Sequence, residues 1–91
     1  MQSKQKSKMV LVRDHALERA RLRLGFTGSD AEVTDQVIDV FDNSRRAREC
    51  RNAVEYTHGE LTFRVFEKRQ FIEIVTLFTN AAEAAEEGLY A

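Results

Sequence analysis

The 91-residue chain contains no proline, no tryptophan, a single cysteine and only four glycines. The lack of proline and the low glycine content exclude a collagen-like chain and a proline-rich linker. Cys50 has no second cysteine with which to form an intrachain disulfide, which is typical of a protein from a reducing cytoplasm. No hydrophobic run approaches the roughly 20 residues that a membrane helix needs, so no membrane association is expected.

Signals for export and for cofactor binding are missing as well. Between the basic N-terminus and Arg13, only Met9–Val12 is apolar, whereas a secretory signal needs about 7–15 apolar residues. The sequence has neither GxxxxGK(S/T) nor GxGxxG, and its two histidines and one cysteine are too few for a structural zinc site. We therefore expect a cytoplasmic protein with no cofactor and no metal.

Length and composition indicate one small soluble domain. Hydrophobic residues make up 43% and charged residues 32% of the chain, as in an ordinary globular protein. The first eight residues are polar and basic and cannot bury anything, which predicts a flexible basic arm over 1–8. We expect a single domain over 9–79, followed by an acidic, alanine-rich tail or short helix over 80–91.

Hydrophobic spacing predicts two N-terminal helices. The first begins at Asp14 as N-cap and ends near Leu24, with Gly25 as its left-handed stop. The second begins with a capping box formed by Ser29 and Glu32 and ends at Asn43. Residues at helical spacing are expected to form the core together with two strand residues: Leu17, Ala20, Val33, Val37, Val40, Phe41, Phe63 and Val75.

The remainder of the chain is typical of β-strands. Residues 53–57 and 61–66 flank the turn His58-Gly59-Glu60, and Phe71–Phe78 is rich in β-branched and aromatic residues. Met9–Val12 is either a short edge strand or a hydrophobic lead-in to the first helix. The predicted fold is α+β: two helices packed on a three- to four-stranded antiparallel sheet, with a short C-terminal Ala/Glu helix.

Charge is segregated along the chain although the net charge is only −1. Residues 1–23 hold seven Lys or Arg against two acids, residues 24–43 hold five acids and no base, and residues 44–51 hold four Arg against one Glu. The last group, Arg45, Arg46, Arg48 and Arg51, has two interpretations. The arginines either offset the dipole at a helix C-terminus or form a phosphate track that binds RNA without sequence preference.

His15, Arg19 and Arg23 follow one another at intervals of four and share one face of the predicted first helix. Imidazole suits proton transfer near neutral pH, and guanidinium matches phosphate in charge and geometry. One acid–base group and two phosphate clamps satisfy the needs of metal-independent RNA cleavage, in which the RNA supplies its own 2′-hydroxyl nucleophile. A helix covered with solvated cations is the alternative interpretation.

The segment His15-Ala16-Leu17-Glu18-Arg19-Ala20-Arg21-Leu22-Arg23 resembles the opening "H-A-x-x-R-x-x-x-R" helix of a group of small bacterial and phage domains of unknown function. That group is placed beside the RelE/ParE toxins, in the superfamily of barnase-like and EndoU-like nucleases. The resemblance spans roughly residues 10–79 and ends with the strand sequence V-T-L-F. It implies a RelE-like fold and a toxin-like, metal-independent ribonuclease controlled by an antitoxin partner.

The resemblance also implies where the site lies. In such nucleases a hydroxyl or cation on the last strand often completes the site, and Thr76 has the matching position. The expected catalytic residues are therefore His15, Arg19 and Thr76. The expected phosphate-binding residues are Arg23, Arg45, Arg46 and Arg64, although Arg64 either faces the same cleft or faces solvent.

Two alternatives to a ribonuclease remain at this point. One is a non-catalytic interaction or inhibitor module, phage- or mobile-element-encoded, that binds a host protein through its acidic second helix and tail. The other is a small homodimer that pairs through an exposed strand edge.

Overall fold

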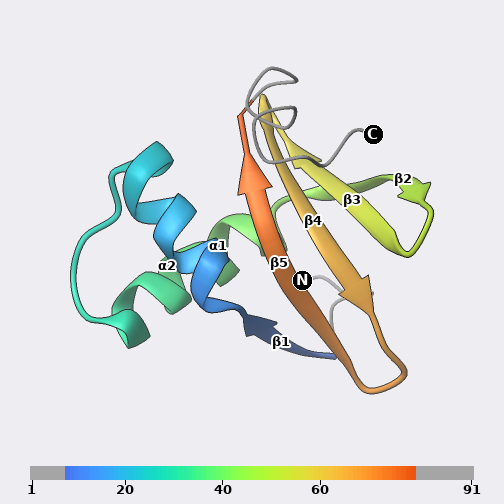
Figure 1. Cartoon of the computed structure of the whole chain (residues 1–91), viewed down its shortest axis with the longest axis horizontal. Coiled ribbons are helices and arrows are strands. Elements are labelled where there is room, and N and C mark those ends of the chain that lie inside the picture. Colours follow the sequence, from blue (N-terminus) through green and yellow to red (C-terminus); the bar gives the residue numbers. More distant parts are fainter. Residues whose placement is uncertain (1–7, 80–91) are drawn as a thin grey trace.

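A computed structural model describes residues 8–79 of the chain. Residues 1–7 of the expected N-terminal arm and the whole expected Ala/Glu tail lie outside the described residues. The elements in chain order are β1 (Met9–Val12), α1 (Asp14–Arg19), the π-helix η1 (Ala20–Leu24), α2 (Asp30–Asp42), β2 (Arg45–Cys50), β3 (Ala53–His58), β4 (Leu61–Glu67) and β5 (Phe71–Phe78) (Figure 1).

The five strands form one mixed sheet in the order β1-β5-β4-β3-β2. Strands β2 to β5 are joined in sequence by turns and pair antiparallel, whereas β1 pairs parallel to β5. The backbone N–H of Arg13 donates to the carbonyl of Ile74 at 3.0 Å, which extends the β1–β5 ladder to the first residue of α1. Helix α1 therefore starts at the edge of β5 where β1 ends, and it packs along that strand.

The predicted fold is wrong in the number and the direction of the strands in its sheet. The sheet has five strands rather than three or four, and it is mixed rather than antiparallel because β1 runs parallel to β5. The additional strand, β2, had no hydrophobic alternation to reveal it, since five of its six side chains are exposed on a sheet edge. The prediction of a RelE-like fold, which rested on an antiparallel sheet of three or four strands, is therefore wrong as well.

Both helices cover one face of the sheet and form the core there. Phe41 of α2 lies over Tyr56 and Phe63, with ring centroids 4.8 and 5.3 Å apart. Six of the eight predicted core residues are buried: Leu17, Ala20, Val33, Val37, Phe41 and Phe63. Val40 and Val75 are half-buried, and Val75 lies outside the core cluster. We call the sheet face opposite the helices the outer face.

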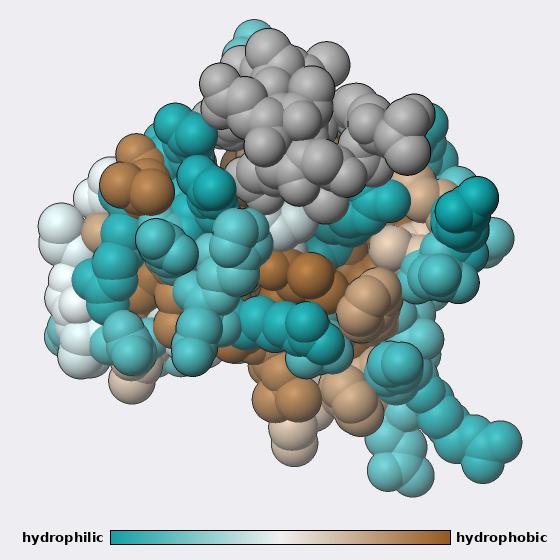
Figure 2. All heavy atoms as spheres, in the orientation of Figure 1, coloured by the Kyte–Doolittle hydropathy of each residue, from teal (hydrophilic) through white to brown (hydrophobic). Residues whose placement is uncertain are grey.

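A few large apolar side chains are exposed on the surface. Met9 is 64% exposed, Leu11 42% and Leu22 63%. Figure 2 shows hydrophobic surface in the centre of the view, between hydrophilic regions on either side. Single exposed apolar side chains of this kind are normal on small domains.

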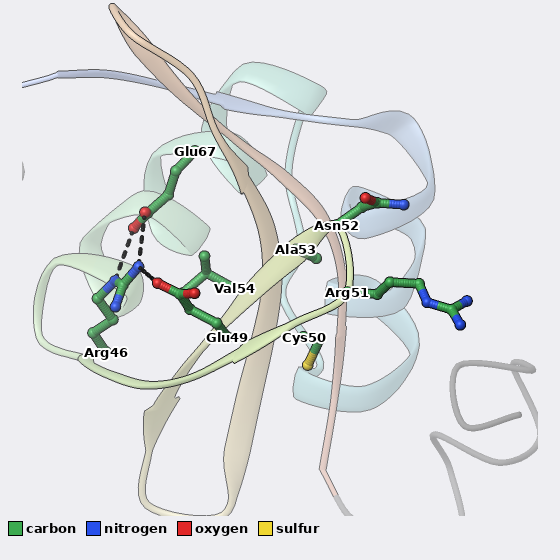
Figure 3. A pocket seen from close by; sticks show the side chains of 8 residues that line it. All are labelled: Arg46, Glu49, Cys50, Arg51, Asn52, Ala53, Val54 and Glu67. Atoms are coloured by element: carbon green, nitrogen blue, oxygen red, sulfur yellow. Dashed lines mark hydrogen bonds and ion pairs between the residues drawn. The ribbon is translucent and has the colours of Figure 1, made fainter.

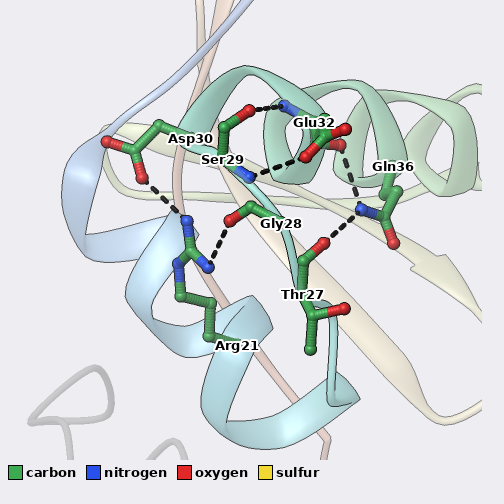
Figure 4. Close-up of polar contacts among 7 residues, drawn as sticks. All are labelled: Arg21, Thr27, Gly28, Ser29, Asp30, Glu32 and Gln36. Atoms are coloured by element: carbon green, nitrogen blue, oxygen red, sulfur yellow. Dashed lines mark hydrogen bonds and ion pairs between the residues drawn. The ribbon is translucent and has the colours of Figure 1, made fainter.

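The predicted capping box at the start of α2 is confirmed (Figure 4). Ser29 Oγ accepts from the Glu32 backbone N–H at 3.2 Å, and Glu32 Oε1 accepts from the Ser29 backbone N–H at 2.8 Å. Arg21 donates to the carbonyl of Gly28 at 2.9 Å and to Asp30 at 2.8 Å, so the first helical segment is tied to the start of the second. These contacts fix how the two helices follow one another.

The first helical segment is less regular than its sequence spacing predicts. Asp14 is the first helical residue and not the N-cap, which is Arg13. The segment widens into η1 at Ala20 and stops at Gly25, which has the predicted left-handed conformation with φ of 72°. The Gly25 backbone N–H bonds to the carbonyl of Ala20, five residues back, as a π-helical turn requires.

Candidate functional site

His15 and Arg19 share one face of α1, as predicted, because the helix is regular over Asp14–Arg19. The opposite side of this segment is held in the core by Ala16, Leu17 and Ala20, all buried. His15 is exposed and Arg19 is half-buried. The helix packs along β5, which is the strand that carries Thr76.

Arg23 lies beyond the regular α-helical part of this segment. It belongs to η1, the π-helical segment that continues α1. Its side chain is exposed. That Arg23 joins His15 and Arg19 as a second phosphate clamp stays a prediction.

The outer face of the sheet carries a polar row that crosses four strands. Register places Arg48 of β2 opposite Glu55 of β3, Glu55 opposite Arg64 of β4, and Arg64 opposite Thr76 of β5. Directly opposed residues of antiparallel strands point to the same face. We call these four residues the cross-strand row.

Two β-bulges produce the row. On β2 the register shifts between Arg46 and Arg48, so Ala47 is left over and Arg48 comes to lie opposite Glu55. On β5 the register shifts between the partners of Arg64 and Val65, so Val75 is the extra residue of the bulge and has no opposing residue on β4. Bulges of this kind re-aim side chains and are over-represented beside active sites.

The β5 bulge also corrects the expected position of Thr76. Simple alternation places Thr76 on the same apolar face as Ile72 and Ile74. In the structure Ile74 and Leu77 belong to the core cluster, whereas Thr76 lies opposite Arg64 on the outer face. Thr76 is 2% exposed, so its hydroxyl is buried.

Glu55 is the central charge of the cross-strand row and is only 5% exposed. Its Oε1 accepts from Arg48 Nε at 3.0 Å. Its Oε2 lies 3.6 Å from Arg64 Nη1, close enough for an ion pair but too far for a hydrogen bond, and it is shielded from solvent. A buried carboxylate between two guanidinium groups holds both arginines near each other.

Arg46 lies apart from the row and takes part in a separate network (Figure 3). It is opposite Tyr56, a core residue, so it occupies the helix-side face of the sheet at the edge. Arg46 donates to Glu67 at 3.2 and 3.3 Å and to Glu49 at 3.0 Å, and Tyr56 also donates to Glu67. Hydrogen bonds from Glu67 and then Glu49 raise the pKa of the Arg46 guanidinium above its usual range.

The same network affects Tyr56 and Glu67. Burial, followed by the hydrogen bond to Glu67, raises the pKa of Tyr56 to about 12. Burial by itself would raise the pKa of Glu67, but the hydrogen bonds from Arg46 and Tyr56 outweigh it and lower that pKa below its ordinary 4.5. Arg46 is thus paired with two carboxylates, and its role as a phosphate clamp stays a prediction.

Arg45 and His58 complete the positions singled out from the sequence. Arg45 is exposed and lies opposite Thr57, on the same outer face as the cross-strand row. His58 Nδ1 lies 3.2 Å from the carbonyl of Asn43, which connects the end of β3 to the end of α2. This contact gives His58 a structural role in the turn.

Among the hollows on the surface of residues 8–79, two lie near the residues considered above. One, of about 300 Å³, lies between the β2–β3 turn and the end of β4 (Figure 3), and its lining includes Arg46, Cys50 and Glu67. The other, of about 320 Å³, lies beside α1, and its lining includes Leu17, Arg21 and Asp30. Neither is lined by His15, Arg19 or the cross-strand row.

Sequence reasoning missed Glu55, and it did not pair Arg48 with it. A signal for Glu55 was available, because a lone charged residue in a strand of otherwise buried side chains requires a partner. Nothing in the sequence signals the bulge at Ala47 that places Arg48 opposite it.

Within residues 8–79 no group of three or more His, Cys, Asp or Glu side chains is arranged to hold a metal ion. No helix in this part of the chain is long and apolar enough to cross a membrane. No protein family, curated protein or solved structure matches the chain.

Proposed function

We propose that the protein is a toxin-like, metal-independent ribonuclease, with His15 as the group that exchanges a proton and Arg19 as the group that binds the reacting phosphate. The observation that supports it is the placement of His15 and Arg19 on one turn of α1, with the His15 side chain exposed.

The proposed reaction uses the RNA as its own nucleophile. The 2′-oxygen attacks the neighbouring phosphorus, the P–O5′ bond breaks, and the products are a 2′,3′-cyclic phosphate and a 5′-hydroxyl. His15 transfers one of the two protons that must move, and a positioned acid–base group typically contributes about 10²–10⁴ in rate. Arg19 offsets the negative charge that develops on the phosphate oxygens.

Residues on the outer face of the sheet, opposite the helices, supply a second RNA-binding surface in this proposal. Arg64 and Arg48 add positive charge on the outer face, Arg45 extends it, and the Thr76 hydroxyl adds a polar group between Arg64 and the β5 edge. A toxin of this type works in the cytoplasm and is held inactive by an antitoxin protein that binds to it.

Incubation of the full chain with a single-stranded oligoribonucleotide in a buffer containing a metal chelator tests the proposal. We expect cleavage with products that carry a cyclic phosphate on one side and a 5′-hydroxyl on the other. Expression of the chain should also arrest bacterial growth. Intact RNA, together with normal growth, contradicts the proposal and favours a non-catalytic protein-binding module, which a salt-insensitive complex with a protein partner would identify.

A further inference from the structure

Glu55 has a carboxylate oxygen, Oε2, that accepts no hydrogen bond and whose contact is the 3.6 Å ion pair with Arg64. Its Oε1 accepts from Arg48, whereas Oε2 makes no hydrogen bond and is shielded from solvent. Buried polar atoms nearly always have a hydrogen-bond partner, and a carboxylate oxygen without one destabilises the native state.

The surroundings of Glu55 argue against a purely structural role. Its neighbours along β3, Val54 and Tyr56, supply the core contacts of this strand. A β-branched residue at position 55 would support the strand without a buried charge. Instead, one bulge brings Arg48 to Glu55 and a second brings Thr76 to the same row. Each bulge interrupts the regular pairing of its strand, and together they gather polar and charged side chains on this face.

We propose that Glu55 Oε2 accepts a hydrogen bond from a ribose 2′-hydroxyl, and that Arg48 and Arg64 bind the adjoining phosphate, so that the row distinguishes RNA from DNA. This inference rests on the proposed function. An ionised carboxylate oxygen only accepts hydrogen bonds, so its ligand atom must be a donor. Guanidinium groups on both sides select phosphate. A hydroxyl donor next to a phosphate is what a ribonucleotide has and a deoxyribonucleotide lacks.

The ion-pair geometry is compatible with an exchange of partners. Arg64 Nη1 is 3.6 Å from Oε2, so turning the Arg64 guanidinium toward a phosphate breaks no hydrogen bond to that oxygen. Arg48 has a side chain that is 58% exposed and uses its Nε for Glu55 Oε1. A guanidinium carries five N–H donors, so Arg48 can bind a phosphate and keep this contact.

Binding of three matched oligonucleotides measures the proposed discrimination. Fluorescence anisotropy is recorded with the full chain carrying His15→Ala, which prevents turnover, against one sequence made as RNA, as DNA and as 2′-O-methyl RNA. We expect RNA to bind about tenfold or more tightly than DNA, the effect of one hydrogen bond to a charged group. The 2′-O-methyl RNA has no hydroxyl donor and should bind as weakly as DNA.

Substitutions in the same background assign the effect to the row. Glu55→Gln should bring the RNA-to-DNA ratio close to one, whereas Arg48→Gln should weaken RNA and DNA by similar factors. Arg45→Gln, on the same strand, is the control that should keep the ratio. The proposal is overturned if 2′-O-methyl RNA binds as tightly as RNA, if Glu55→Gln folds and keeps the ratio, or if no oligonucleotide binds. If Glu55→Gln does not fold, the comparison of RNA with 2′-O-methyl RNA decides whether a 2′-hydroxyl is recognised. Cleavage of RNA by the unaltered chain is a separate measurement, which tests the proposed function and not this inference.

Discussion

Thr76 lies directly opposite Arg64 on the outer face of the sheet because β5 holds one residue more than β4 between the pairs Arg64–Thr76 and Val65–Ile74. The extra residue, Val75, reverses the alternation of the strand. A hydroxyl that strict alternation would bury beneath the helices is thereby placed in a row with three charged side chains. The second bulge, at Ala47, has the same effect on the opposite side of the row.

The core prediction concerns Val37, which is fully buried between α2 and the sheet. Val37→Asp should abolish cooperative folding, because an unpaired buried charge costs several kcal/mol and a small domain has about 5–15 kcal/mol in total. Thermal unfolding followed by circular dichroism shows whether the variant has a cooperative transition. Asp35→Asn, on the exposed side of α2, is the control that should unfold like the parent. A cooperative transition at the parent's temperature in Val37→Asp would show that α2 is not packed as described.

The capping box at Ser29 makes a measurable contribution to stability. Ser29→Ala should lower the free energy of unfolding by about 1 kcal/mol, since the Glu32 backbone N–H loses its acceptor. Urea denaturation of the variant and the parent gives the difference. Thr27→Ala, an exposed position just before the box, should leave the midpoint close to that of the parent. An unchanged midpoint in Ser29→Ala would mean that the cap does not stabilise α2.

Acid should destabilise the protein partly through Glu67. Its folded-state pKa lies below 4.5, so its contribution to stability is complete above 4.5 and is lost as the pH falls through the lowered pKa. Glu67→Gln should therefore be less stable than the parent near neutral pH and lose less stability on acidification. Unfolding measured at a series of pH values from about 6 downward gives the two slopes. Equal slopes in the variant and the parent would show that Glu67 does not contribute to the acid sensitivity of the fold. The control is Glu60→Gln in the exposed β3–β4 turn, which should give the slope of the parent.

Salt dependence separates the arginines that bind phosphate from those that are already neutralised. RNA affinity should fall steeply between low and moderate salt, because binding releases counterions from the phosphates. Arg45→Ala should reduce the slope, since Arg45 is exposed on the outer face. Arg46→Ala should change it little, because Glu49 and Glu67 already neutralise Arg46. The opposite order, with Arg46 dominating the slope, would place RNA on the helix side of the sheet.

The sequence was sufficient to predict α2, its cap and its buried face, because Val33, Val37 and Phe41 repeat at helical spacing over 13 residues. It also predicted the β3–β4 hairpin and the Gly25 stop. These features depend on local chemistry: the conformational freedom of glycine, a side-chain cap and a hydrophobic period.

The remaining features depend on long-range pairing, which a single sequence does not display. Strand β2 has no buried alternation, and the parallel β1–β5 pair joins residues about sixty positions apart. Bulges at Ala47 and Val75 change which side chains face each other without any glycine or proline to mark them. The change from an α-helix to a π-helix at Ala20 was likewise not predicted from the sequence.

The most direct measurement of the central claim is the single-turnover rate of RNA cleavage in metal-free buffer by the parent chain, His15→Ala and His58→Ala. Loss of a positioned acid–base group should lower the rate of His15→Ala by about 10²–10⁴. Its melting temperature should match that of the parent, since His15 is exposed. His58→Ala should retain cleavage, because His58 contacts a backbone carbonyl in the turn. A parent chain that cleaves no RNA, or a His15→Ala variant that cleaves as fast as the parent, would contradict the account.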